Sequence, residues 1–210
     1  MLRASRSLLA LGRPDLFRDL VRTMETIVDA ESEQLENRGR LLLDEAEYLK
    51  VIHGTTAVLF GWACAVGGVA AGRPSVEVAA LRSFGEQFGI AFQITDDLLD
   101  VSGNPEITGK SLFADLREGK ATYPLIAAAR SDPDTARRLA NMGQGHSDLA
   151  RPEIQAELAA IVTRPECLAD TRARALHFAE AAMRELGILA PGPACSLLRA
   201  LVRASIDRDC

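Results

Sequence analysis

The sequence predicts an all-α protein, and both its composition and the spacing of its apolar residues indicate this. Hydrophobic residues make up 48% of the 210 residues, whereas aromatic residues make up only 5%. The core is therefore filled mainly by Ala and Leu, which favour closely packed helices over sheet. Apolar residues also recur every three or four positions along several segments, as in helices with one buried face. A chain of this length and apolar content predicts one domain.

The first expected helix covers residues 14–37. Leu16, Leu20, Met24 and Ile27 recur along it at intervals of three or four, which forms a stripe that must be buried against other apolar surface. Seven further helices are expected at residues 45–70, 76–101, 120–129, 133–141, 152–162, 165–186 and 192–208. Between the third and fourth, residues 103–119 are expected to form an ordered loop with a short helical turn.

The helix expected at residues 45–70 has a start signal and a stop signal. Asp44 is a candidate N-cap, and Gly72 is followed by Arg and Pro, the usual order at a helix end. Four small residues near its end predict the close approach of another helix: Gly67, Gly68, Ala70 and Ala71.

The helix expected at residues 76–101 ends in an acidic cluster. Asp96, Asp97 and Asp100 form a DDxxD pattern directly after a stripe of apolar residues. Asp96 and Asp100 lie one above the other on a helix, with Asp97 about 100° round. Such closely spaced carboxylates repel one another unless a cation lies between them. Oxygen ligands without His or Cys suit Mg²⁺, so we expect a magnesium site, although a DDxxD pattern alone also fits a solvated acidic turn.

The acidic cluster is part of a longer pattern over residues 92–124. It reads FQxxDDxxD and then G-K-x-x-x-x-D-L-x-E-G-K-x-T-x-P. This composite resembles the second aspartate-rich region of the trans-isoprenyl diphosphate synthases, also called the polyprenyl synthetase family. The resemblance implies the helical bundle of the isoprenoid synthases. A terpene cyclase on the same fold would usually show an Asn/Ser/Glu metal motif here and would lack the lysine-containing tail.

The resemblance implies roles for several further side chains. In this family the three aspartates of the pattern would hold Mg²⁺, and Asp115 would support the metal region. Lys110 and Lys120, each preceded by Gly, would reach the diphosphate of an allylic substrate. Gln93 would face the substrate, although a single Gln on an apolar helix is more often a buried hydrogen-bonding group.

The resemblance extends over the whole chain, which corresponds to the last two-thirds of a family member as a single partial domain. Residues 48–60, YLKVIHGTTAVLF, resemble the family's YLxxIxxKTAxLF helix, and residues 7–40 and 189–208 resemble helices before and after it. Two features are missing. No second acidic cluster stands in for the first aspartate-rich motif, and Thr55 occupies the place of the expected Lys. We therefore expect an N-terminally truncated version of the bundle.

Charge and cysteine content limit the other functions. A net charge of −5 gives no reason to expect nucleic-acid binding. No membrane span is expected, because the apolar run at residues 58–71 is short and rich in Gly. The four cysteines are dispersed without metal-binding spacing, which favours reduced thiols in a cytoplasmic protein.

Two interpretations of function remain open. In the first, the chain is a component of a Mg²⁺-dependent prenyltransferase that adds isopentenyl diphosphate to an allylic prenyl diphosphate. In the second, it is a degenerate regulatory or structural subunit that pairs with a complete synthase. Both predict a partner, either a second copy or a chain that supplies the first aspartate-rich motif. A truncated gene is a third explanation.

Overall fold

A computed structural model of the chain describes residues 6–8, 10, 12–41, 43–103, 112–142 and 151–208. These residues form helices and connections, and no strand is found among them, which confirms the all-α prediction. The elements are α2 (Pro14–Glu36), α3 (Glu45–Ile52), η1 (His53–Ala57), α4 (Val58–Ala70), α5 (Ser75–Ser102), α7 (Ala114–Arg117), α8 (Tyr123–Ser131), α9 (Pro133–Met142), α10 (Pro152–Val162), α11 (Pro165–Glu185) and α12 (Pro193–Ile206).

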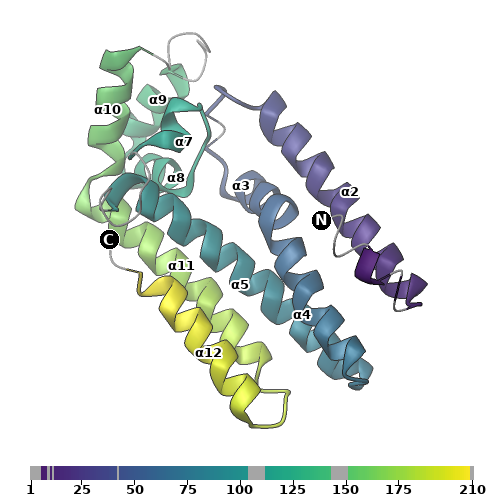
Figure 1. The fold of residues 1–210 in the computed structure, drawn as a ribbon. Coiled ribbons are helices and arrows are strands. Elements are labelled where there is room, and N and C mark those ends of the chain that lie inside the picture. Colours follow the sequence, from purple (N-terminus) through teal and green to yellow (C-terminus); the bar gives the residue numbers. More distant parts are fainter. Residues whose placement is uncertain are drawn as a thin grey trace.

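The long helices surround α5, which runs through the centre of the molecule (Figure 1). Helices α4 and α11 pack against α5, α2 lies outside α3 and α4, and α12 lies beside α11. The short helices α7, α8, α9 and α10 gather at the end of the molecule where α5 finishes (Figure 1). The acidic cluster at the end of α5 is therefore placed beside these short helices.

Glycines allow α4 and η1 to cross α5 at backbone contact. A Cβ atom on Gly85 would lie 2.4 Å from the carbonyl oxygen of Phe60, and one on Gly89 would lie 2.7 Å from the Cα atom of Ala57. The prediction of a close approach at the end of α4 holds only in part. A Cβ atom on Gly68 would lie 2.8 Å from a side-chain atom of α5, whereas Gly67 has nothing within 4 Å.

The predicted helix limits agree with the structure within three residues. The Asp44 side chain accepts a hydrogen bond from the backbone N–H of Glu47 at 3.0 Å, which confirms the predicted cap. After α4, Gly72 takes the left-handed conformation with φ of 65°. The largest difference is at α8, which begins at Tyr123 instead of residue 120, because Thr122 is extended and Pro124 opens the helix.

The helix predicted at residues 45–70 is continuous, but it is not regular. Residues 53–57 form a π-turn, in which the N–H of Val58 bonds to the carbonyl of His53. Such turns insert an extra residue and are frequent at functional sites. On its outer side, Gly54 lies against α2, where an added Cβ atom would be 2.5 Å from that of Ala30.

The apolar stripe of α2 is buried in its first half, at Leu16 and Leu20, and partly buried at Met24 and Ile27. Leu16 and Leu20 are buried and form a small cluster with Leu8, against which Met24 and Trp62 pack. The buried half of the stripe therefore does not require a partner chain. A second stripe on α2 does reach the surface, where residues seven positions apart are exposed: Val21, Val28 and Leu35.

The α3–η1–α4 segment bears on the prediction that the chain has no membrane span. Judged by length and composition alone, Glu45–Ala70 is the one helix of the described residues that could cross a membrane. The apolar run at residues 58–71 lies within a longer continuous helix that begins at Glu45, as predicted. A core helix of a soluble protein meets the same criteria. Tyr48, Ile52 and Ala57 are buried in the main core, although only 28% of the most apolar window is buried within the chain.

Candidate functional site

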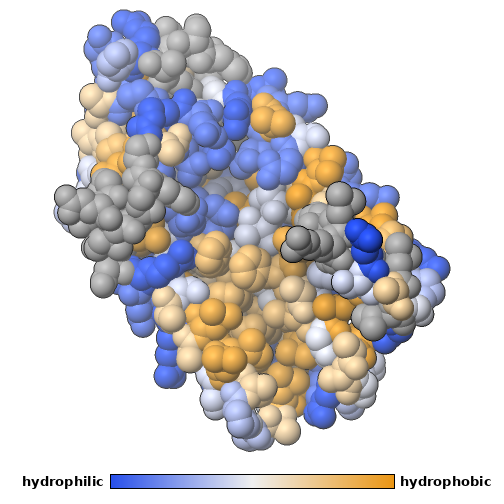
Figure 2. All heavy atoms as spheres, in the orientation of Figure 1, coloured by the Kyte–Doolittle hydropathy of each residue, from blue (hydrophilic) through white to orange (hydrophobic). Residues whose placement is uncertain are grey.

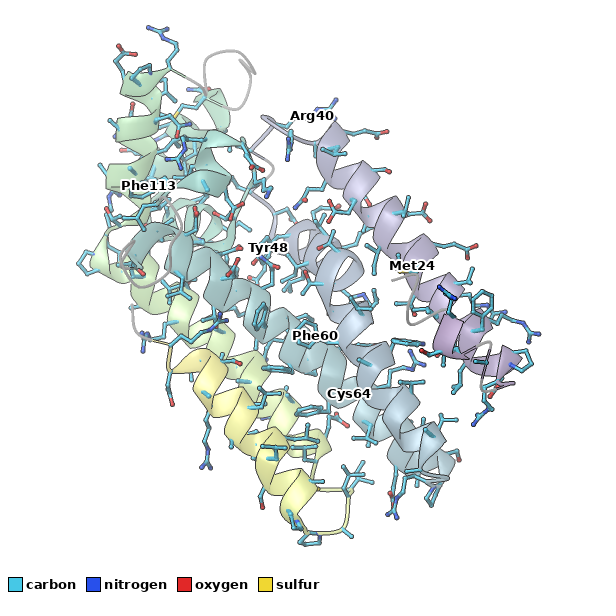
Figure 3. The ribbon with its side chains drawn as sticks, viewed as in Figure 1. Met24, Arg40, Tyr48, Phe60, Cys64 and Phe113 are labelled. Carbon is cyan, nitrogen blue, oxygen red and sulfur yellow. The ribbon has the colours of Figure 1, made fainter. Side chains whose placement is uncertain are left out.

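A cleft of about 190 Å³ lies between α2, the α3–η1 segment, α5 and the residues that precede α8. Its lining is rich in polar and charged side chains. The residues that form it are Glu31, Gln34, Asn37, Arg38, Glu47, Tyr48, Val51, Ile52, Thr55, Thr56, Gln93, Asp97, Asp115, Gly119, Lys120, Ala121 and Thr122. Tyr48 lies between α3 and α5 in the middle of this region (Figure 3).

Asp97 is a buried carboxylate that the surrounding protein holds in place. Its side chain is 3% exposed, and Oδ2 accepts hydrogen bonds from the hydroxyl of Tyr48 at 2.7 Å and the N–H of Tyr123 at 3.2 Å. Oδ1 accepts from Nε2 of Gln93 at 3.1 Å. Burial raises the pKa of Asp97 to about 7, although these hydrogen bonds favour the charged form. The same burial and the carboxylate of Asp97 raise the pKa of Tyr48 well above its ordinary value.

The π-turn orients Gln93 toward Asp97. Thr56 donates a hydrogen bond from its hydroxyl to Oε1 of Gln93 at 3.0 Å, so the amide NH₂ is left to face the carboxylate. Thr55, beside it, also lines the cleft. Gln93 lines the cleft and is hydrogen-bonded at both ends of its amide, so its role toward a substrate stays a prediction. Thr55, which stands where the resemblance expects Lys, thus faces the same cleft as Gln93.

Asp100 binds the backbone of the following segment. Its two carboxylate oxygens accept hydrogen bonds from the N–H groups of Ala114 and Asp115, at 3.0 and 3.3 Å. Phe113, immediately before α7, has a left-handed φ of 60°, and its own N–H bonds to the carbonyl of Asp100 at 2.8 Å. Burial and the charge of Asp115 raise the pKa of Asp100. Asp100 therefore positions Asp115 at the start of α7.

A chain of ion pairs crosses the mouth of the cleft. The ammonium group of Lys120 lies 2.8 Å from Oδ1 of Asp115 and 3.1 Å from Oε2 of Glu118. The same oxygen of Glu118 lies 3.0 Å from the guanidinium of Arg38. Partial burial lowers the pKa of Lys120, but the contacts with Asp115 and Glu118 outweigh it, so the pKa is raised overall.

The structure brings together four of the predicted site residues and separates others. Gln93, Asp97, Asp115 and Lys120 line the cleft, whereas Asp96 and Asp100 do not. Asp96 is partly exposed at the same end of α5. Lys110 lies outside the described residues.

The residues at this end of α5 fit a hard cation in their chemistry. Burial is the largest cause of the raised pKa of Asp97 and of Asp100, and the negative charge of Asp115 raises both further, so a cation among these carboxylates would relieve their repulsion. Within the described part of the chain, no three His, Cys, Asp or Glu side chains form a ready-made metal cage. Mg²⁺ does not need one, because it usually binds one or two carboxylates together with waters and substrate phosphates.

Arg38 and Tyr48 are among the residues of the site that the sequence did not single out. Arg38 precedes a loop and carries no signal that would place it in a cleft. Tyr48 does carry a weak signal, because it lies one turn before Ile52 on the buried face of α3, and a buried Tyr hydroxyl normally finds a partner.

The helical bundle and the polar cleft beside DDxxD define a protein of the isoprenoid-synthase fold. A sequence model described as polyprenyl synthetase matches residues 1–161. The chain therefore belongs to the polyprenyl synthetase family.

Relatives of known activity support this assignment. Octaprenyl diphosphate synthase of Escherichia coli (strain K12) is 32% identical over 99% of this chain and 64% of the relative. Octaprenyl diphosphate synthase of Haemophilus influenzae is 33% identical over 87% of this chain and 55% of the relative. The chain thus spans about half to two-thirds of the length of these relatives.

Solved structures show the same fold. A polyprenyl synthase from Caulobacter crescentus, complexed with calcium and isoprenyl diphosphate, matches all of this chain and 63% of its own, with a TM-score of 0.89 and 30% identity. A decaprenyl diphosphate synthase from Rhodobacter capsulatus matches 99% of this chain and 63% of its own, with a TM-score of 0.86 and 31% identity.

Proposed function

We propose that the chain is a component of a Mg²⁺-dependent trans-prenyltransferase that adds isopentenyl diphosphate to an allylic prenyl diphosphate. The observation that carries the proposal is the cleft, which gathers Gln93, Asp97, Asp115 and Lys120 in a member of the polyprenyl synthetase family. These side chains offer carboxylates for a cation and an ammonium group for a phosphate, which a diphosphate–magnesium complex requires together.

In this proposal Asp96, Asp97, Asp100 and Asp115 provide the oxygen ligands for Mg²⁺. When bound, Mg²⁺ would neutralise the negative charge on the departing pyrophosphate. The hydrogen bonds that Asp97 accepts from Tyr48 and Gln93 fix its position before a ligand arrives. This preorganisation is favourable because the carboxylate need not be oriented on binding.

Lys120 and Lys110 are proposed to bind the allylic diphosphate. Lys120 is 26% exposed and lines the cleft, so its ammonium group can exchange a carboxylate for a phosphate oxygen. Gln93 is proposed to bind the same substrate through the cleft, which it lines. Each of these groups stabilises negative charge without acting as a nucleophile.

The prenyl chain and a partner would need apolar surface, which the molecule offers. Figure 2 shows apolar side chains gathered over the region where α4, α5 and α12 lie in Figure 1. Phe60 and Cys64 lie in this region between α4 and α5 (Figure 3), and Phe60 contacts Phe92 with ring centres 5.4 Å apart. A surface of this kind normally meets a ligand or another protein.

We propose that this partner is a second copy or a chain that supplies the first aspartate-rich motif, and that the assembly is cytoplasmic. A relative from Geobacillus stearothermophilus, 32% identical over 95% of this chain, is named heptaprenyl diphosphate synthase component 2. A relative named as one component supports the proposal of a heteromeric assembly. On α12 the side chains of Leu197 and Leu201 are 71% and 47% exposed, which provides further apolar surface.

One observation favours the non-catalytic alternative. Thr55 lines the cleft where the resemblance expects Lys, so the site has one positive charge fewer than expected. A chain that binds diphosphate without transferring it could regulate a complete synthase through the same surface.

Isopentenyl transfer distinguishes the two functions. The purified chain is incubated with labelled isopentenyl diphosphate, farnesyl diphosphate and Mg²⁺, alone and with a complete synthase from the same organism. Little product is expected from the chain alone, because loss of one preorganised charge-stabilising donor costs roughly 10²–10³-fold in catalysis. A mixture whose product increases, and whose increase disappears with Asp96→Ala/Asp100→Ala, supports the enzyme component. An increase that survives this double change supports a regulatory subunit, and efficient turnover by the chain alone would remove the need for a partner.

A further inference from the structure

We propose that Arg38 is a second diphosphate-binding cation and that Glu118 occupies its binding position until a ligand arrives. The inference rests on the proposed function, because it assigns another residue to the same cleft. Its starting point is the single oxygen atom Oε2 of Glu118, which contacts both the guanidinium of Arg38 at 3.0 Å and the ammonium of Lys120 at 3.1 Å. An anionic oxygen held between a guanidinium and an ammonium group has the environment that phosphate oxygens take in proteins.

The backbone places Arg38 beside the loop that carries Glu118. The N–H of Gly39 donates to the carbonyl of Gly119 at 2.9 Å and joins the end of α2 to the segment before α8. Both glycines have a positive φ, 78° and 70°, which side chains rarely adopt. Arg38 therefore lies at the cleft because of the fold around it, and not only because of its ion pair.

Charge within the cleft indicates why a second cation matters. Among the described residues that line it, Arg38 and Lys120 are the cations, and four side chains are acidic: Glu31, Glu47, Asp97 and Asp115. A diphosphate carries several negative charges, and Thr55 supplies none of the positive charge expected at its position. Arg38 offers this charge from the turn that follows α2.

The contact between Glu118 and the two cations is suited to displacement. The side chains of Arg38 and Glu118 are 43% and 49% exposed, and ion pairs at this exposure contribute little to stability. A diphosphate brings more charge and can bind a guanidinium through two oxygens at once. The carboxylate can therefore swing into solvent while both cations turn to the ligand.

Calorimetric titration with inorganic pyrophosphate at saturating Mg²⁺ tests the proposal. Arg38→Gln is expected to weaken pyrophosphate binding about tenfold or more, because it removes a charge-assisted hydrogen bond. Arg40→Gln is the matched control, since Arg40 is an exposed arginine two residues away that does not line the cleft. It is expected to bind within about twofold of the wild type, as expected of a screened surface charge. Glu118→Gln is expected to bind more tightly than the wild type, because its two cations lose a competing anion.

The outcomes separate this inference from the proposed function. Lys120→Gln tests the site itself and is expected to weaken binding. If Lys120→Gln weakens binding and Arg38→Gln behaves like Arg40→Gln, the role of Arg38 is wrong and the site survives. Weaker binding by Glu118→Gln would show that Glu118 positions Lys120 instead of occupying the place of a phosphate. Absence of pyrophosphate binding by the wild type would overturn both proposals. Unchanged thermal unfolding of each variant establishes that the differences arise from binding.

Discussion

The hydroxyl of Tyr48 donates a hydrogen bond to Asp97 at 2.7 Å and joins two residues that are 49 positions apart in the chain. This contact joins α3 to α5 at the base of the cleft. Both groups are buried, so water cannot take the place of either hydrogen-bonding partner. The hydrogen bond therefore contributes to the fold and to the geometry of the site.

Tyr48→Phe is expected to destabilise the protein by about 1–3 kcal/mol, because it leaves a buried carboxylate oxygen with one donor fewer. Urea unfolding measures this difference. Tyr123→Phe is the matched control. It removes a hydroxyl whose partner, Arg130, is 55% exposed and can be solvated, so a smaller loss is expected. Equal losses of stability in the two variants would show that the hydrogen bond to Asp97 contributes no more to stability than the one between Tyr123 and Arg130.

Asp97 makes the stability of the unliganded protein depend on pH. Its folded pKa of about 7 lies above the ordinary value of 3.8, so the folded state binds the proton more tightly than the unfolded state. The stability that this adds is fully present below the ordinary value and is lost as the pH rises through about 7. Asp97→Asn cannot titrate, so its unfolding free energy between these two values is expected to fall less than that of the wild type. Denaturant titrations at several pH values in this range measure the unfolding free energy of both proteins. If it changes with pH equally in both, the raised pKa of Asp97 is contradicted.

Thr55→Lys is expected to strengthen binding of pyrophosphate in the presence of Mg²⁺ by several-fold or more, since it restores a positive charge in the cleft. Thr163→Lys makes the same change at an exposed position at the end of α10 and is expected to leave the affinity unchanged. Calorimetry compares the two variants. An equal gain in both would attribute the effect to net charge and not to the site.

Gly85→Ala tests the crossing of α4 and α5. The added Cβ atom would meet the carbonyl oxygen of Phe60 at 2.4 Å, so the helices must separate, at a cost of about 1–3 kcal/mol. Gly67→Ala adds the same atom where nothing lies within 4 Å, and it is expected to stabilise the helix by roughly 0.5–1 kcal/mol. Thermal unfolding compares the stability of the two variants. Equal effects would show that α4 and α5 do not make their close contact at Gly85.

The purified chain is expected to self-associate or aggregate unless its partner is present. Its 22.6 kDa monomer leaves Leu197 and Leu201 exposed on α12, and apolar surface of this kind favours association. Size exclusion with light scattering measures the mass. Leu197→Asp/Leu201→Asp is expected to shift the mass toward the monomer, whereas Arg199→Asp on the same helix controls for added negative charge. A stable wild-type monomer at micromolar concentration would refute the prediction.

Local sequence pattern was sufficient to predict the helices and the position of the acidic cluster. The apolar period of α5 continues to the aspartates, so their location at its end follows from helix geometry. Asp97, Gln93, Asp115 and Lys120 were chosen because their segment resembles a known motif, and the fold places all four at one cleft.

The remaining features depend on contacts between distant segments. The hydrogen bond from Tyr48 to Asp97 joins positions 49 residues apart, and the ion pair of Arg38 with Glu118 joins positions 80 residues apart. The spacing of apolar residues within one helix carries no information about contacts between such distant positions. The burial of the α2 stripe depends on the side chains of α4 that face it, including Trp62. The π-turn likewise departs from the regular 3.6-residue period on which the prediction was based.

The hydrogen bonds that Asp100 accepts from the backbone provide a way to detect a ligand in the site. Its carboxylate oxygens are the acceptors for the N–H groups of Ala114 and Asp115, so a ligand that draws on these oxygens competes with the backbone of α7. Amide hydrogens held in this way exchange slowly with solvent, and they exchange faster once their acceptor is lost. Hydrogen exchange at these two peptide groups would thus detect filling of the site without a labelled substrate.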